Sequence, residues 1–238
     1  MIGEKIIRLN AVDSTNNYIK ENMNHLPNGT IVTSNTQTRG RGRGNHVWES
    51  DLGNLYFSFI IKNDIGYNKV FELLSKVSLA VVNTLNHFNV KTLIKYPNDI
   101  LIKNKKISGI LIETYGNLEL EGVIIGVGIN VNQTNFNELN NKATSVKSIT
   151  NENLDISNVL SKFIQSYNDL SKQGKNEIYN GYIRNSMVIG KDIDYNGKTY
   201  KVETVLETGE LLISNKEDVM RLSLNEVKTP ERVNSSIS

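Results

Sequence analysis

The sequence predicts an α+β fold, in which helices cover a mixed β-sheet and a small β-rich domain follows. Two observations lead to this prediction. Segments with the two-residue period of strands and the 3.6-residue period of helices occur in the order strand–helix–strands–helix–strands. The C-terminal part then changes character and becomes a series of short strand-like runs separated by turn dipeptides.

The N-terminal segments are short and separated by clear turn signals. Asp13 and Ser14 are suitable N-caps for a helix, and the glycine of residues 27–29 ends a turn. The expected strands lie at 5–9, 30–36 and 54–62, the expected helix follows its caps through Asn16 to about Asn24, and a glycine-rich loop lies at 37–47. Alternation in the third strand predicts one strongly apolar face.

A long amphipathic helix is expected next, because apolar residues recur at helical spacing through 69–87. The strands that follow are expected at 91–95, 100–103, 107–115 and 119–131, with a hairpin turn at 103–106. Residues 155–186 are predicted to be helical, with a break near Gly174.

The C-terminal domain is expected to begin near Met187. Strand-like runs lie at 189–195, 198–207, 210–214 and 218–223, with Asn196-Gly197 and Thr208-Gly209 as turns. Such spacing is typical of a small β-barrel. The predicted domains are therefore 1–187 and 188–238.

Composition excludes several classes of site and protein. The chain has no cysteine, which excludes disulfides and thiolate metal sites, and its three histidines are scattered. We find neither a long apolar run nor a signal-like start, so a cytoplasmic protein without membrane contact is expected. A net charge of +2 is too small to indicate general nucleic-acid affinity.

The segment Arg39–Gly44 alternates arginine with glycine. Glycine allows close backbone approach to a ligand, and arginine supplies planar donors for carboxylate and phosphate. The segment therefore fits a loop that wraps an anionic small molecule. An RNA-binding segment and a plain surface loop remain open alternatives.

Three further segments carry weaker signals. Lys106 precedes Gly109 inside an expected strand, where glycine often marks a close approach. Residues 95–99 combine a proline with Asn98 and Asp99, which either cap a turn or organise a cation. Residues 126–130 place two glycines before Asn130 without the third glycine and helix of a dinucleotide fingerprint. Each segment alone has an ordinary structural explanation.

Together, these segments resemble the biotin protein ligase family. The matching segments, in family order, are Ser14-Thr15-Asn16; Gln37 with Gly40-Arg41-Gly42-Arg43 and Trp48; Lys95-Tyr96-Pro97-Asn98-Asp99; Lys106-Ile107-Ser108-Gly109-Ile110-Leu111; and Gly126-Val127-Gly128-Ile129-Asn130. Tyr96 stands where family members usually carry tryptophan. The resemblance implies a class II synthetase-like catalytic domain with a C-terminal SH3-like β-barrel.

The resemblance also implies a two-step reaction. Biotin attacks the α-phosphate of MgATP to give biotinyl-5′-AMP, and a lysine of a biotin carboxyl carrier domain then displaces AMP. Cations must offset the repulsion between two anions, and Arg43 and Lys106 are expected to do so, with Asp99 assisting the amine or orienting cations. The Arg-Gly loop, residues 40–48, is expected to close over the ligands and exclude water. This requires the loop and Lys106 to lie together in space.

The family pattern assigns two sets of binding residues. Biotin is expected at Ser14, Thr15, Asn16, Gln37, Gly40, Arg41, Gly42, Trp48, Lys106, Gly109 and Leu111, and the adenylate at Arg41, Arg43, Trp48, Lys95, Asn98, Lys106 and Asn130. Metal ligands are not assigned. Because the first strand begins near residue 5, no room remains for a DNA-binding domain, and no DNA binding is expected.

Two alternatives remain. A lipoate–protein ligase would share the fold and reaction, and a non-catalytic RNA-binding protein would use only the arginine-rich segment. A homodimer is a further expectation from the family.

Overall fold

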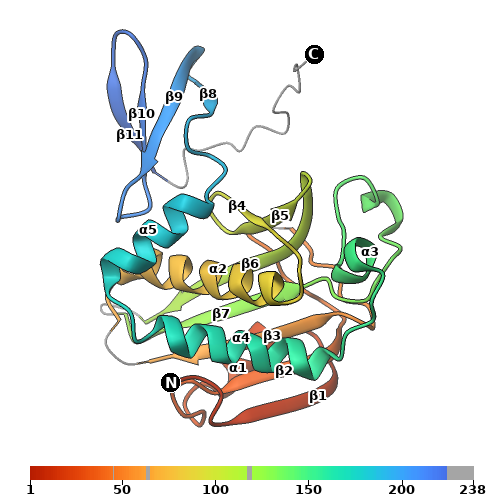
Figure 1. Ribbon diagram of the computed structural model, residues 1–238. Coiled ribbons are helices and arrows are strands. Elements are labelled where there is room, and N and C mark those ends of the chain that lie inside the picture. The colour runs from red at the N-terminus through yellow and green to blue at the C-terminus, as the bar shows by residue number, and fades with distance from the viewer. Residues whose placement is uncertain (45, 63–64, 117–119, 224–238) are drawn as a thin grey trace.

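A seven-stranded mixed sheet forms the centre of the molecule in the computed structural model, which describes residues 1–44, 46–62, 65–116 and 120–223 (Figure 1). The strands are β1 (Ile6–Val12), β2 (Ile31–Gln37), β3 (Leu55–Ile61), β4 (Leu93–Lys95), β5 (Asp99–Ile102), β6 (Lys105–Tyr115) and β7 (Gly122–Ile129). Their order is β1-β2-β3-β7-β6-β5-β4. β1 and β2 are parallel, and all other pairs are antiparallel. The predicted strands are confirmed, apart from shifts of a few residues at their ends; residue 119 lies outside the described residues.

The helices cover both faces of this sheet. They are α1 (Thr15–Asn22), α2 (Val70–His87), α3 (Val146–Thr150), α4 (Ile156–Leu170) and α5 (Lys175–Asn185), with short 3₁₀ helices at Tyr67–Lys69 and Asn137–Leu139. Figure 1 shows α2, α4 and α5 together over one face. The break expected near Gly174 separates α4 from α5, whereas α3 and the 3₁₀ helices were not predicted.

Strand alternation creates two cores. Ile31, Phe59 and Ile125 face the large cluster under α2 and α4, while their neighbours Val32, Ile60 and Ile124 face a smaller cluster with Ile19 of α1. Because successive side chains in a strand point to opposite faces, α1 lies on the face opposite α2. The segments that precede and follow α1 therefore lie on the face of the sheet opposite α2.

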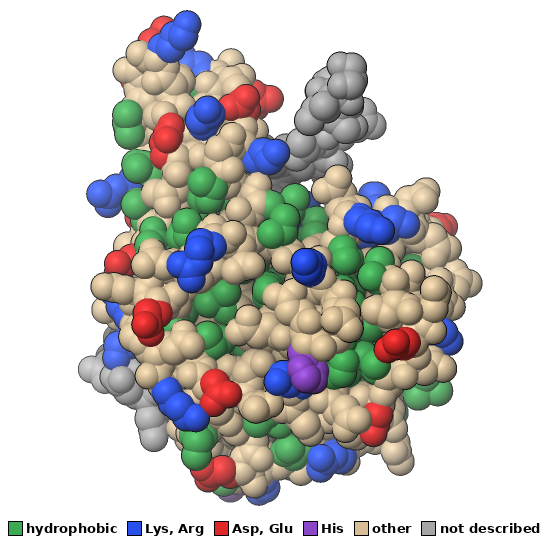
Figure 2. Space-filling model, viewed as in Figure 1, with side chains coloured by type: hydrophobic (Ala, Val, Ile, Leu, Met, Phe, Trp, Pro, Cys, Tyr) green, Lys and Arg blue, Asp and Glu red, His purple; other side chains and the backbone are tan. Residues whose placement is uncertain are grey.

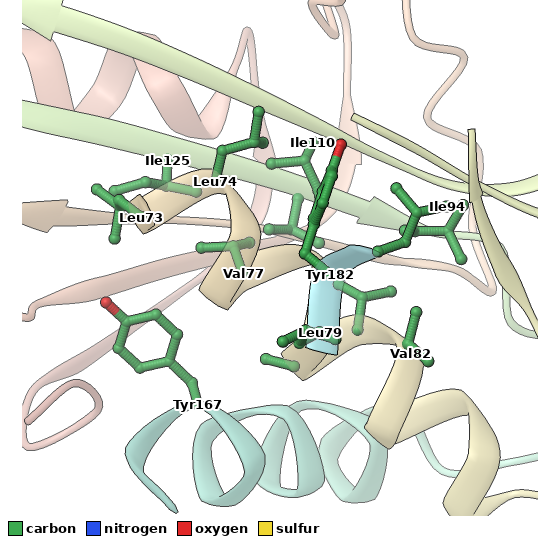
Figure 3. Close-up of a cluster of buried hydrophobic side chains, with 14 of the residues drawn as sticks. Leu73, Leu74, Val77, Leu79, Val82, Ile94, Ile110, Ile125, Tyr167 and Tyr182 are labelled. Carbon is green, nitrogen blue, oxygen red and sulfur yellow. The ribbon is translucent and has the colours of Figure 1, made fainter. Parts of the chain in front are cut away.

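Helix α2 is central to the larger core. Figure 3 shows Leu74 and Val77 of α2 between the sheet residues Ile110 and Ile125 and the side chain of Tyr167 from α4. Phe57 and Phe163 add an edge-to-face contact at 4.7 Å between ring centroids. This packing holds the sheet rigid beneath the opposite face.

The apolar face predicted for β3 is confirmed, because Leu55, Phe57 and Phe59 belong to the large cluster. The burial of the alternate residues Tyr56, Ser58 and Ile60 was not predicted. The cause is that α1 covers the second face. Ser58 is therefore a buried polar residue in a central strand.

A second, four-stranded antiparallel sheet stands at one end of the molecule, above α5 in Figure 1. Its strands are β8 (Asp192–Tyr195), β9 (Lys198–Val205), β10 (Leu211–Ser214) and β11 (Val219–Leu222), in the order β11-β10-β9-β8. The small C-terminal β unit is thus confirmed. The division at residue 187 stays a prediction, and residues 224–238 of the expected domain lie outside the described residues.

The small sheet is tied to the main part by its β9–β10 turn. Tyr96 Oη donates to Gly209 O at 2.6 Å, Tyr179 Oη donates to Val205 O at 2.6 Å, and Lys175 pairs with Glu207. Val205 and Leu211 belong to the same hydrophobic cluster as α2. No helix in the described ranges is long and apolar enough to cross a membrane.

Candidate active site

A polar cavity of about 670 Å³ opens where the expected site segments meet. Its volume suits a small molecule of cofactor size. The predicted residues that line it are Ser14, Thr15, Asn16, Gln37, Arg41, Gly42, Arg43, Trp48, Lys95, Asn98, Asp99, Lys106, Gly109 and Leu111. The Arg-Gly loop and Lys106 therefore lie together, as the functional interpretation required.

Bare backbone under Trp48 forms the floor of this cavity. A β-carbon at Gly128 would stand 2.5 Å from Trp48 Cε2, and one at Gly109 would stand 2.8 Å from Trp48 Cζ3. Real β-carbons do not come so close, so both glycines are needed for the indole to lie flat on β6 and β7. The indole Nε1–H is buried without a hydrogen-bond partner in the structure.

The cationic end of the cavity is built from β5, β6 and the loop. Lys106 Nζ pairs with Asp99 Oδ1 at 2.7 Å and lies 5.0 Å from the centre of the Trp48 ring. Arg43 Nη1 donates to Asn98 Oδ1 at 3.4 Å. Two cations thus face one space, and only Lys106 has a close carboxylate partner among these contacts. This end can accept an anion.

Lys106 differs in position from the expectation. It was placed on the hairpin turn, but the turn is tighter: Lys103 and Asn104 take positive φ angles and β6 begins at Lys105. The β5–β6 register also shifts between Ile100 and Leu101, which is opposite Lys106. Lys106 therefore projects from a strand, where its position is better defined than in a turn.

Neutral hydrogen-bonding groups form the other end. Thr15 N–H and Oγ1–H both donate to Gln37 Oε1, at 2.8 and 3.1 Å, and Thr15 Oγ1 lies 2.6 Å from Ser58 Oγ. Asn16 accepts from Ser58 and donates to Glu113 Oε2 at 2.7 Å. These groups are nearly all paired, so they are held in fixed orientations.

The Arg-Gly loop has a hairpin-like backbone. Gly42 N–H donates to His46 O at 2.8 Å, Trp48 N–H donates to Gly40 O at 2.9 Å, and Arg41 forms a bridge with Val47. Val47 is 77% exposed and borders the cavity, whereas Trp48 packs against the glycines of β6 and β7.

Two expected binding residues do not line the cavity. Gly40 lies beside Trp48 O and Ser50 Oγ, so it supports the base of the loop. Asn130 is 6% exposed, and its side-chain amide donates to Thr144 O at 3.0 Å. The segment before α3, which supplies this acceptor, was not predicted to pack there.

Sequence reasoning missed several residues that the structure brings to the site. Ser58 and Glu113 are polar residues within apolar runs of central strands, and this signal was present in the sequence. Phe57 and Gly126 line the cavity directly, whereas Ser58 and Glu113 contact the lining residues Thr15 and Asn16. Glu113 pairs with Arg41 Nη1 at 2.9 Å. Within the described ranges, no group of three or more His, Cys, Asp or Glu residues is placed to hold a metal ion.

A sequence model of the biotin/lipoate A/B protein ligase family matches residues 9–130, which contain all the residues that line the cavity. The chain belongs to this family.

Members of the biotin/lipoate A/B protein ligase family resemble the chain over nearly its full length. It is 33% identical to the bifunctional ligase/repressor BirA of Bacillus spizizenii and 34% identical to that of Bacillus subtilis, each over 93% of this chain and 73% of the relative. The biotin protein ligase from Aquifex aeolicus in complex with biotin and ATP superposes with a TM-score of 0.77, at 27% identity, covering 94% of this chain and 97% of that one. The catalytic-domain fold with a small C-terminal β unit is thereby confirmed.

Proposed function

We propose that this chain is a biotin–protein ligase, which uses ATP to convert biotin into biotinyl-5′-AMP and then transfers biotin to a lysine of a carrier domain. One observation carries the proposal. A single cavity joins a neutral, prearranged hydrogen-bonding end to a cationic end with Lys106 and Arg43. Biotin has a matching polarity, with a neutral ureido ring at one end and a carboxylate at the other.

The first step joins two anions. The biotin carboxylate attacks the α-phosphate of ATP, an oxygen–phosphorus bond forms, and pyrophosphate leaves. Lys106 and Arg43 offset the repulsion and the charge that develops on the phosphate. Asp99, the carboxylate at this end of the cavity, would help to hold the Mg²⁺ of MgATP, which would neutralise charge on the phosphates. Lys95 and Asn98 are also on the cavity wall, within the proposed adenylate region.

The second step consumes the adenylate. The amine of the carrier lysine attacks the acyl carbon, an amide forms, and AMP leaves. The mixed anhydride is susceptible to hydrolysis, so the Arg-Gly loop must exclude water until the carrier arrives. We propose a biotin carboxyl carrier domain as the partner. The adenine role of Asn130 stays a prediction.

The neutral end of the cavity favours biotin over lipoate. A ureido ring offers two N–H donors and one carbonyl acceptor, whereas a dithiolane ring offers only weak sulfur acceptors. Thr15, Asn16 and Gln37 place polar side chains on the cavity wall, which suit the strong donors and acceptor of a ureido ring better than weak sulfur acceptors.

Exchange of labelled pyrophosphate into ATP tests the assignment. We expect exchange that depends on biotin and is absent with lipoate, because only biotin fills the polar end of the cavity. Octanoate serves as a control for a carboxylate without a ring. Exchange with lipoate and none with biotin would overturn the proposal.

The RNA-binding alternative has less support. Arg41, one of the cations of the arginine-rich segment, is already paired with Glu113. On the face seen in Figure 2, basic and acidic side chains are interspersed rather than gathered into a basic stripe.

The homodimer and the cytoplasmic location stay predictions. Sedimentation of the purified chain with and without biotinyl-5′-AMP tests whether it forms a homodimer.

A further inference from the structure

A continuous path of polar contacts leaves the Arg-Gly loop at Arg41 and returns to it at Trp48. The path runs from Arg41 to Glu113 (2.9 Å), Asn16 (2.7 Å), Ser58, Thr15 (2.6 Å), Gln37 (3.1 Å), Ser50 (2.8 Å) and finally Trp48 O (3.0 Å). It crosses α1, β3, β6 and the end of β2. Both sides of the loop are therefore attached to the wall that holds the neutral groups.

Glu113 supplies the negative charge in this path. It lies on the same face of β6 as Gly109 and Leu111. Its backbone partner in the neighbouring strand β7 is Ile124. One carboxylate oxygen accepts from Arg41 and the other accepts from Asn16. Glu113 therefore connects the glycine-rich Arg-Gly loop to α1 in the wall of the cavity.

We propose that Glu113 is a positioning residue, which holds the Arg-Gly loop closed through Arg41 while it orients Asn16 at the neutral end of the cavity. The effect on the adenylate rests on the proposed function, whereas the attachment of the loop does not.

The strength of this contact suits a loop that opens and closes. The side chains of Arg41 and Glu113 are 40% and 25% exposed, and partly exposed ion pairs shift an equilibrium by about five-fold or less. A much stronger pair would keep substrate out, and no pair would let the intermediate escape. Arg41 also donates to Asn17 Oδ1 at 3.1 Å, which directs its guanidinium toward α1 in the closed position.

Glu113→Gln separates the two roles of this side chain. The amide can still accept from Asn16 but no longer attracts Arg41 as an ion. We therefore expect the loop to open more often while the neutral end stays in place, so that KM for biotin changes little and escape of biotinyl-5′-AMP rises about two- to five-fold.

Trp48 reports loop position directly, because it is the single tryptophan of the chain. We expect the acrylamide quenching constant of its emission to rise about two-fold in Glu113→Gln and in Arg41→Gln. The double variant should be quenched no more than either single variant, since one contact is removed in all three. The matched control is Glu121→Gln, which should behave as wild type. Glu121 is exposed and lies between β6 and β7, immediately before β7 begins.

The outcomes are distinct. Quenching unchanged in Glu113→Gln, or additive effects in the double variant, would overturn the proposal, and urea midpoints equal to wild type exclude partial unfolding as the cause of a change. Arg41→Gln alters the same contact from the loop side, and so tests it if the Glu113 variant does not fold. A wild-type chain that makes no adenylate defeats the proposed function but leaves the quenching test intact.

Discussion

The pairing of Lys106 with Asp99 means that the key cation of the cavity is already neutralised before a ligand arrives. An entering carboxylate or phosphate must compete with Asp99 for the ammonium group at 2.7 Å. The free site therefore does not hold a bare ammonium group, which would be costly to bury. Asp99 therefore keeps Lys106 ready without blocking the anion site.

Lys106→Ala should lower adenylate formation by about 100- to 1000-fold, the usual effect of removing one electrostatic contact to a developing charge. The fold should survive, since the side chain is partly exposed. Single-turnover formation of biotinyl-5′-AMP measures the effect, with circular dichroism as the check on folding. Lys103→Ala, at the exposed turn of the same hairpin, is the matched control and should retain wild-type rates. Equal losses in both variants would contradict the role.

Arg43→Gly should change retention rather than formation of the intermediate. Its guanidinium reaches Asn98 across the cavity mouth, so its loss opens a route by which the adenylate leaves. We expect the escape rate of biotinyl-5′-AMP to rise at least about ten-fold and lysines of unrelated proteins to become labelled. Labelling of added serum albumin measures the escape. Arg39→Gly, before the loop, should show no such labelling.

At the scale of elements, the strands β6 and β7 act as a flat support. Gly128→Ala should push Trp48 off the sheet, because the new β-carbon would stand 2.5 Å from the indole. We expect biotin affinity to fall about ten-fold or more, with a red shift in Trp48 emission. Titration calorimetry with biotin measures the affinity. Gly174→Ala, where no atom lies within 4 Å of the added carbon, is the control.

Strand and helix positions could largely be predicted, since their periodicity is local. α2 was expected at 69–87 and lies at Val70–His87, because its apolar spacing has no competing interpretation. The double burial of β3 could not be predicted, because it depends on α1 packing over Ser58 from more than 40 residues away. The five-residue helix α3 is too short to show a period.

The site shows the same division. Lys106, Arg43 and Trp48 were predicted because their residue types and order carry chemistry, and the structure places them in one cavity. Glu113 and Ser58 were missed, since a polar residue inside an apolar strand gives no hint of its partner. The adenine role of Asn130 stays a prediction, and the hydrogen bond from its amide to Thr144 O could not be predicted from the sequence.

At the scale of the whole molecule, the small sheet is attached at the cavity wall. Tyr96 lines the cavity and donates to Gly209 O in the β9–β10 turn. Burial raises the pKa of Tyr96 above its ordinary value, so the phenol stays protonated at neutral pH and the bond persists. The C-terminal unit and the site therefore share one residue.

Tyr96→Phe should destabilise the protein by about 1–3 kcal/mol, because the partly enclosed carbonyl of Gly209 loses its donor. Urea unfolding measures the change. Tyr67→Phe, at a side chain that is exposed, should alter stability by less than about 0.5 kcal/mol. Equal unfolding midpoints for wild type and Tyr96→Phe would contradict the importance of this contact.

The walls of the cavity come from stretches that are distant along the chain and are joined by strand pairings such as β3–β7, β6–β7 and β5–β6. No single hairpin forms the cavity, so a partly folded chain has no binding site for the small molecule. Ligand binding therefore stabilises the folded central sheet. It raises the free energy of unfolding by about 2.7 kcal/mol when the ligand concentration is a hundred times its Kd. Cells rich in the vitamin would consequently hold a more durable population of the enzyme than starved ones.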